Sequence, residues 1–158
     1  MRGILIILLA ISIVGCSRSK EDGNYSKVSA DDPAMNAAIA KAKATVGDFV
    51  QAFHAQKAGT SKYCVKKPFP TPNGGEEHMW ITVTDEHNGI LKGIVQSEAE
   101  ETREVKQGQE VELNILEISD WSYADGRKLI GGYTIRYFLD KMSAKERQEF
   151  LENNGMEL

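Results

Sequence analysis

Cysteine, proline, basic charge and long apolar runs are all scarce in this sequence, and each shortage excludes a class of protein. Of 158 residues, two are cysteine and four are proline, too few for a disulfide-rich or proline-rich chain. Nineteen basic residues against 23 acidic ones leave a formal charge of −4, so nucleic acid is not an expected partner. No repeat period is present. This length fits one globular domain plus extensions.

The longest apolar run lies at the amino terminus and indicates an export signal. Met1-Arg2-Gly3 gives a short positive start, and residues 4–14 are apolar apart from Ser12. That length suits a signal peptide and is too short to span a bilayer. The run ends in Ile13-Val14-Gly15-Cys16, which resembles the lipobox of bacterial lipoproteins, where diacylglycerol alkylates the cysteine thiol before cleavage. An ordinary signal peptide and an uncleaved anchor are the alternatives.

The lipobox resemblance implies an order of segments along the chain. Residues 1–15 are the signal peptide, residues 16–31 are a lipidated cysteine with a flexible polar tether, and residues 32–158 are a single globular domain. Acyl chains on Cys16 would hold the protein to the lipid bilayer. Ser17 at the next position points to the outer membrane, with the domain facing the periplasm. Loss of Arg2 with the signal leaves 18 basic against 23 acidic residues, a side-chain balance of −5.

The sequence of the domain predicts an α+β fold, in which an N-terminal amphipathic helix packs on a small antiparallel sheet of hairpins and C-terminal helices follow. Asp32-Pro33 is typical of a helix start, and apolar residues at spacings of three and four predict a helix to about Gln56. The predicted strands are 62–67, 79–84, 90–95, 110–118, 121–123 and 128–130, with a phase shift near Leu116 and a loop at 68–75. Asn88-Gly89 predicts a type I′ turn. Helices are predicted at 133–142 and, after a capping box at Ser143, to Asn153.

Three stretches of this domain carry a resemblance to a known family. They are Glu77–Val83, Gly89–Gly93, and Ile118–Tyr123 continuing into Gly131–Arg136. Together they resemble the YegJ-like family, a bacterial domain of unknown function, over roughly residues 32–138. The resemblance implies an α+β domain, and it implies no reaction, cofactor or catalytic residue.

Cys64 is the free thiol of the domain once Cys16 is lipidated, and two interpretations are open. A cysteine within a predicted strand is usually a small buried core residue. Alternatively, His78 or His87 could generate its thiolate and make a Cys/His nucleophile. The absence of a nucleophile-elbow or helix-start context favours the core role.

The remaining candidates are acidic, histidine and aromatic residues. Glu76, Glu77, His78, Asp85 and His87 lack the spacing of a metal site, so no metal or cofactor is predicted. His54 is expected to interact with the end of its helix. The aromatic and arginine candidates for a binding face, more often core residues, are Trp80, Trp121, Tyr123, Tyr133 and Arg136. Asp120 and Arg136 are expected to form a structural pair.

These observations favour a noncatalytic module that binds an envelope protein or a small ligand. One alternative is a cell-envelope hydrolase that uses Cys64 and His78. The other is an immunity or inhibitor protein whose acidic surface would block a basic partner. A cluster at Glu98, Glu100, Glu101 and Glu104 would serve that second role, although a run of charges is usually a solvated surface.

The lipobox makes the first testable prediction. Mass spectrometry of the membrane-extracted protein should find a chain that begins at an acylated Cys16. The substitution Cys16→Ser removes the acceptor thiol, so the variant should accumulate as unprocessed precursor or leave the membrane fraction. Detection of an unmodified chain that begins at any other residue would contradict the prediction.

Overall fold

The computed structural model describes residues 4–7 and 26–158, and these form the α+β domain expected from the sequence. The strands are β1 (Ile4–Ile7), β2 (Ser26–Ser29), β3 (Thr60–Pro70), β4 (Glu76–His87), β5 (Ile90–Val95), β6 (Glu110–Asn114), β7 (Asp120–Asp125) and β8 (Lys128–Gly131). The helices are α1 (Pro33–Ala44), α2 (Val46–Ala55), α3 (Tyr133–Lys141) and α4 (Ala144–Asn153), with a 3₁₀ turn at Ile115–Glu117. Among the described helices, none is both long and apolar enough to cross a membrane.

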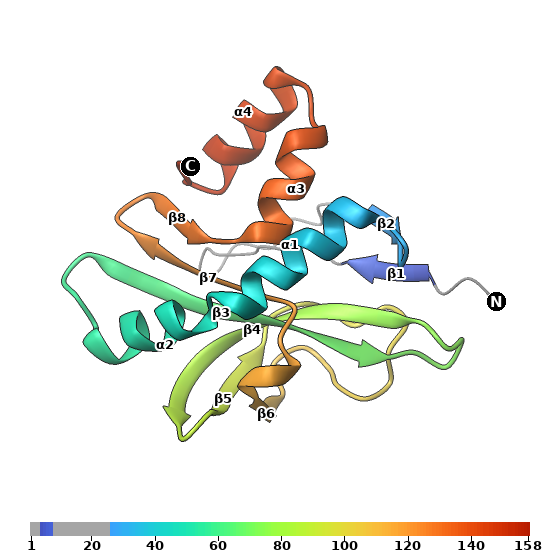
Figure 1. Cartoon of the computed structure of the whole chain (residues 1–158), viewed down its shortest axis with the longest axis horizontal. Coiled ribbons are helices and arrows are strands. Elements are labelled where there is room, and N and C mark those ends of the chain that lie inside the picture. The colour runs from blue at the N-terminus through green and yellow to red at the C-terminus, as the bar shows by residue number, and fades with distance from the viewer. Residues whose placement is uncertain (1–3, 8–25) are drawn as a thin grey trace.

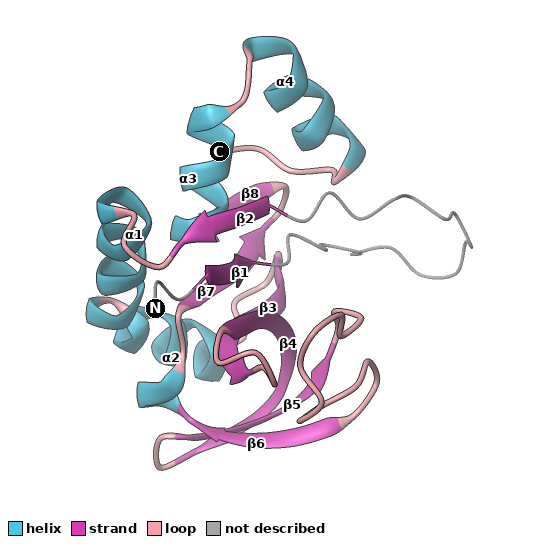
Figure 2. Cartoon of the chain, turned by 90° about the vertical axis from the view of Figure 1, so that its right-hand side faces the viewer, coloured by secondary structure: helices cyan, strands magenta, loops and turns pink. Residues whose placement is uncertain are grey.

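The strands of the described chain form one curved sheet in the order β2-β1-β4-β3-β7-β8, with β5 added to β4 and β6 added to β5. The β1–β4 pair is parallel and the other pairs are antiparallel. The long strand β4 meets β3 along one edge, and along the other it meets β1 at Glu76–His78 and β5 at Ile81–His87. In Figure 1, α1 and α2 cross one face of the sheet. Figure 2 shows α3 and α4 at one end of the molecule, and β5 and β6 at the other.

The predicted helix 33–56 is divided in two at Thr45, and a side chain from β7 explains the break. Trp121 donates its indole N–H to the Ala42 carbonyl at 3.0 Å and to the Thr45 hydroxyl at 3.2 Å. The Thr45 hydroxyl donates in turn to the Lys41 carbonyl at 2.8 Å. These side-chain bonds compete for the carbonyls of the last turn of α1. The predicted helix start is confirmed, because the Asp32 carboxylate accepts the amides of Ala34 and Met35, both at 2.9 Å.

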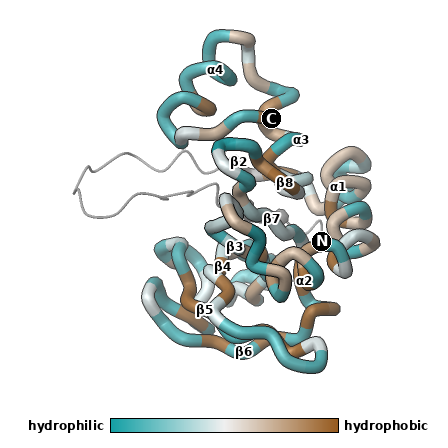
Figure 3. The backbone as a smooth tube through the Cα atoms, turned by 90° about the vertical axis from the view of Figure 1, so that its left-hand side faces the viewer, coloured by the Kyte–Doolittle hydropathy of each residue, from teal (hydrophilic) through white to brown (hydrophobic). Residues whose placement is uncertain are grey.

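Three apolar clusters hold the layers together, and one of them joins α1 to α3 through Met35, Tyr137 and Phe138. The largest lies between α2 and the sheet and includes Phe49, Val65, Ile81 and Leu91, with Trp121 at its edge toward α1. The third lies under α3 and consists of Trp80, Leu129, Ile135, Leu139 and Met156. Figure 3 shows hydrophobic and hydrophilic positions alternating along β5 and β6, as a strand with one buried face requires.

Local turn and cap signals are confirmed at their predicted positions. Asn88 and Gly89 have φ values of 52° and 80°, as a type I′ turn requires, and β5 spans the predicted residues 90–95. The capping box of α4 is present, because the Ser143 hydroxyl accepts the Glu146 amide and the Glu146 carboxylate accepts the Ser143 amide. These signals need no distant partner.

Two predicted element boundaries are wrong, and one segment gains a strand partner. Ser26–Ser29, in the predicted tether, pairs as strand β2 with β1 of the predicted signal segment. The loop prediction fails at residues 68–70, which continue β3 and pair with β4. The strand predicted at 110–118 ends at Asn114, and the phase shift near Leu116 is a 3₁₀ turn capped by the Asn114 side chain. Cys16 and Ser17 lie outside the described residues, and of the predicted signal segment the structure describes residues 4–7.

Gly131 should be the least replaceable glycine of the sheet. Its φ is +72°, and an added Cβ would overlap the Trp121 carbonyl oxygen and lie 2.5 Å from the indole ring. Gly126 has a φ of +60° with no atom within 4 Å of its Cβ position, so it controls for backbone strain alone. Gly126→Ala should cost about 1 kcal/mol, and Gly131→Ala about 3 kcal/mol, because overpacking adds to the strain. Equal losses in urea unfolding would contradict this account.

Candidate functional site

A buried polar cluster lies on the sheet face beneath α3. Lys66 of β3 and Asp120 of β7 are both 0% exposed. Lys66 donates its ammonium to the Thr134 hydroxyl at 2.7 Å, and Thr134 donates to the Asp120 carboxylate at 2.6 Å. The Lys66 Nζ also lies 4.6 Å from the centre of the Trp80 ring. Lysine and aspartate are thus linked through a threonine that belongs to the first turn of α3.

Asp120 performs the N-cap role for α3. Gly132, the N-cap residue, has no side chain to satisfy the first helical amides. The Asp120 carboxylate accepts the amides of Tyr133 at 3.1 Å and Thr134 at 2.8 Å, in addition to that of Trp121 at 2.8 Å. Burial raises the pKa of Asp120, against the opposing effects of Lys66 and these hydrogen bonds. Burial lowers the pKa of Lys66 to about 8.

His78 is buried beside this cluster and is held neutral. Its Nδ1 lies 2.7 Å from the Ser119 hydroxyl, which donates to the Lys66 carbonyl at 3.3 Å. The imidazole tautomer sets which of the two side chains donates in the His78–Ser119 bond. Its Nε2 is buried and has no hydrogen-bond partner among the described residues. Burial, with the nearby Lys66 charge, lowers the pKa of His78 to about 3, which makes it a weak base at neutral pH.

Cys64 and His78 do not meet. Cys64 pairs with Thr82, four positions along β4 from His78, which is roughly 13 Å at the rise of a strand. The Cys64 Sγ lies 3.7 Å from the Thr82 hydroxyl. The side chain is partly buried against the cluster beneath α3, and burial raises the pKa of its thiol. An activated thiolate requires a lowered pKa, so this geometry gives the Cys/His hypothesis no support.

Glu77 has a structural contact that explains its burial. Its carboxylate accepts the amides of Glu100, Glu101 and Thr102 at 2.8, 2.9 and 2.6 Å. Glu77 thereby fixes the loop between β5 and β6. Glu76, Asp85 and His87 are exposed on β4, and within residues 4–7 and 26–158 no group of three His, Cys, Asp or Glu side chains has the geometry of a metal site.

Most of the aromatic and basic candidates are buried or bonded within the fold. Trp80 and Trp121 are 4% and 2% exposed, and Tyr133 packs edge-on to Trp121 at 5.7 Å. The predicted Asp120–Arg136 pair is wrong: Arg136 donates to the carbonyls of Gly131 and Leu129 at 2.9 and 2.7 Å. The reason is that Lys66 and the α3 amides already surround Asp120.

His54 was expected to interact with the end of its helix, and instead it pairs with a carboxylate of β4. It bonds Glu86, whose other oxygen accepts the Gly89 amide at 2.8 Å. That bond fixes the hairpin turn against α2.

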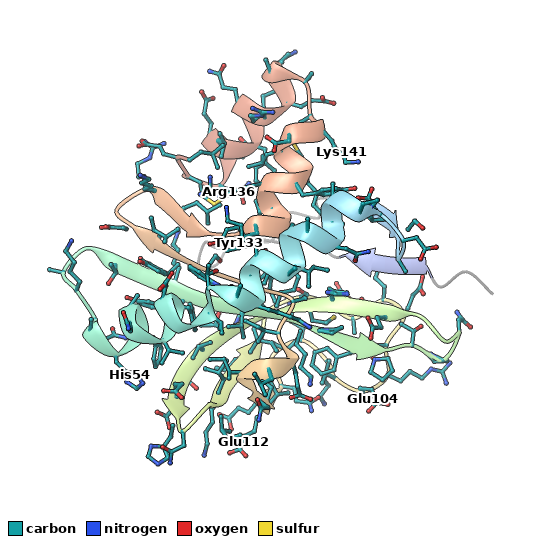
Figure 4. The ribbon with its side chains drawn as sticks, viewed as in Figure 1. His54, Glu104, Glu112, Tyr133, Arg136 and Lys141 are labelled. Carbon is teal, nitrogen blue, oxygen red and sulfur yellow. The ribbon has the colours of Figure 1, made fainter. Side chains whose placement is uncertain are left out.

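A groove between β3 and β6 is an open site that these contacts leave available. It has a volume of about 550 Å³ and is lined by residues 67–70 of β3, Glu104 and Val105 of the loop, and residues 109–113 and Glu117. Phe69, Val105 and Leu113 are 7%, 9% and 3% exposed and give it an apolar floor. Figure 4 shows Glu104 and Glu112 at the margin opposite α3 and α4.

The groove rim is acidic. Four glutamates line it, at positions 104, 110, 112 and 117, against the single lysine Lys67. Lys67 is paired with Glu117 at 2.8 Å, and Glu112 is paired across the sheet with Lys92 at 2.9 Å. The Lys67 bond is the main reason that the pKa of Glu117 is lowered. Sequence reasoning missed this site because its walls are 40 residues apart and meet only through the sheet.

The burial of His78 predicts how stability depends on pH. Its pKa is about 3 in the folded state against 6.5 when exposed, so the unfolded chain binds the proton first and stability falls as pH decreases from 6.5 towards 3. Between pH 6.5 and 4.5 the native chain should lose about 2 to 3 kcal/mol more than His78→Asn. The control His87→Asn, at an exposed position of the same strand, should keep the native slope in urea titrations. Parallel curves for all three proteins would disprove the assignment.

Comparisons with known proteins identify the family of this chain. Residues 32–158 match a family described as "Uncharacterized protein conserved in bacteria (DUF2314)". The chain is 30% identical over 149 residues to "Uncharacterized protein YegJ" of Escherichia coli K12, covering 94% of this chain and 95% of that protein, so the YegJ-like resemblance is confirmed. It is also 34% identical over 88 residues to a "Putative ankyrin repeat protein" of Neisseria meningitidis serogroup B, covering 54% of this chain and 35% of that protein. No solved structure matches. The chain belongs to the DUF2314 family of bacterial proteins.

Proposed function

We propose that this chain is a lipoprotein of the bacterial cell envelope whose domain is a noncatalytic binding module. The lipobox ending at Cys16 supports a bilayer anchor. Its Ser17 neighbour favours the outer membrane, with the domain facing the periplasm. Nine residues separate Cys16 from β2, so the tether keeps β2 within roughly 30 Å of the bilayer surface.

The observation that carries the binding role is the groove between β3 and β6. Its volume of about 550 Å³ is in the range of ligand sites in proteins. It combines a buried apolar floor with charged groups at the rim, which is the composition of a recognition surface. The partner is an envelope protein that presents a segment to this groove.

The buried polar groups support binding over catalysis. Lys66 and Asp120 are linked through Thr134, and Asp120 caps α3. The Ser119 hydroxyl is bonded to His78 and to a backbone carbonyl. A nucleophile needs a base poised near neutral pH, whereas the pKa of His78 is about 3. These side chains stabilise the arrangement of β3, β7 and α3.

Site-specific photo-crosslinking in living cells tests the proposal. A photoreactive residue in place of Glu112, at the groove rim, should give a discrete product with one envelope protein. The matched position is Glu149 on α4, which is also exposed and lies at the other end of the molecule, and it should give no such product.

Binding of the identified partner to the purified chain then completes the test. Val111→Trp fills the groove from the half-buried face of β6, so it should lower the affinity at least tenfold. Equal crosslinking from both positions, or an affinity that Val111→Trp leaves unchanged, would count against the groove as the binding site.

A further inference from the structure

Strand β6 has one edge without a strand partner within the described chain, and that edge faces the groove. Its other edge pairs with β5 over the whole strand. The Ile115 amide donates to the Gly89 carbonyl at 2.9 Å, and the Val95 amide donates to the Gln109 carbonyl at 3.0 Å. Since backbone groups alternate in direction along a strand, Val111 and Leu113 bond to β5. The N–H and C=O groups of Glu110 and Glu112 therefore point into the groove.

The opposite wall of the groove cannot form the same ladder. Strand β3 pairs with β7 only as far as Lys66, so the same edge of β3 is free after that residue. The Lys66 carbonyl points to this edge, because it accepts the Ser119 amide there. The backbone groups of Pro68 and Pro70 point to the same edge as those of Lys66, because alternate residues of a strand share a direction. Proline has no backbone N–H to donate there. The Pro70 carbonyl already accepts the Thr102 hydroxyl at 2.8 Å. Only β6 offers both donors and acceptors to a guest.

The side chains around this edge define the guest. A strand added to β6 places alternate side chains on the two faces of the sheet. One set would cover the apolar floor at Phe69, Val105 and Leu113. The other set would lie on the face of Glu110 and Glu112, where opposite charges on neighbouring strands attract.

We propose that the groove binds an extended segment of a partner protein, alternating apolar and basic residues, which adds to the sheet as a strand beside β6. This inference rests on the proposed function and names the mode and chemistry of that binding. Backbone bonds to Glu110 and Glu112 provide the affinity, and the acidic rim with the apolar floor provides the selectivity.

A second copy of the chain is a less suitable guest. A two-fold antiparallel pairing of β6 with itself centred at Glu112 would place Glu112 opposite its own copy and Glu110 opposite Asn114. Like charges directly opposite each other are destabilising. The same charges therefore favour a basic guest and disfavour edge-to-edge dimerisation.

The test uses the full chain and a peptide of seven alternating lysine and valine residues, acetylated and amidated at its ends. Amide hydrogen exchange should slow at least tenfold at Glu110 and Glu112 when the peptide binds. The amides of Val111 and Leu113 should change less, because they already bond to β5. A peptide with glutamate in place of lysine, and one N-methylated at alternate residues, should each bind at least tenfold more weakly.

A charge-reversal variant of the groove rim tests the role of the acidic side chains and is matched by a charge-reversal variant of α4. Glu110→Lys with Glu112→Lys should weaken the lysine–valine peptide at least tenfold, and the affinity of the native chain should fall with added salt. Glu149→Lys with Glu152→Lys, at exposed positions of α4, controls for net charge and should bind as the native chain does. The control changes exposed residues of α4, so its melting temperature should stay close to the native value. Glu112→Lys loses the pair with Lys92 and places a lysine opposite it, so the rim variant should melt somewhat lower, and binding is compared at a temperature where both variants are folded.

Several results would overturn the inference. Strand addition would be refuted if the lysine–valine peptide failed to bind, or if N-methylation left its binding undiminished. Equal binding of the glutamate peptide would refute the basic guest. A concentration-dependent dimer that is lost in Glu112→Lys would point to a second copy of the chain as the guest. A crosslinked partner at Glu112 together with a failed peptide would refute strand addition and leave the binding module intact. If the peptide binds as expected but no partner is captured at Glu112, strand addition at the groove would stand, and the proposal of an envelope-protein partner would fail.

Discussion

The hydrogen bonds around the Asp120 carboxylate are the constraint on which the rest of the fold depends. They join the start of β7 to the first turn of α3 and, through Thr134, to Lys66 in the middle of β3. Burying both charges costs free energy, which four donors to one carboxylate and the opposite charge offset. Removing one partner would leave a buried charge unpaired, so the cluster specifies how α3 lies on the sheet.

This use of the buried polar groups explains why the open groove lies at the sheet edge. The face beneath α3 is filled by the bonded polar cluster and by apolar side chains, and the face beneath α2 is filled by apolar side chains. The sheet stays open where β3 passes beyond β7, because Pro68 and Pro70 supply no donors there. Glu77 holds the loop whose Val105 closes the groove floor. An internal carboxylate thus shapes an external surface.

Signals within a few residues predicted the local structure, and signals that depend on distant partners did not. Asn88-Gly89 and the Ser143 capping box need only their own backbone, and both are present as predicted. The helix break at Thr45 depends on Trp121, 76 residues away. The sequence gives no reason to expect that Lys66 is buried, because Thr134 and Asp120 lie more than 50 residues away along the chain. The groove is likewise invisible in sequence, because it exists only where two strand edges fail to meet.

The position of β1 bears on whether the groove depends on the predicted signal segment. Strand β1 lies in the segment that signal cleavage after Gly15 would remove, and it contacts β4 at Glu76–His78. The residues that line the groove come from β3, β6 and the 104–105 loop, and none of them pairs with β1. Cleavage would therefore uncover one edge of β4 and change the surroundings of His78. The β6 edge would keep its floor, its rim and its exposed backbone groups, so the groove does not depend on the predicted signal segment.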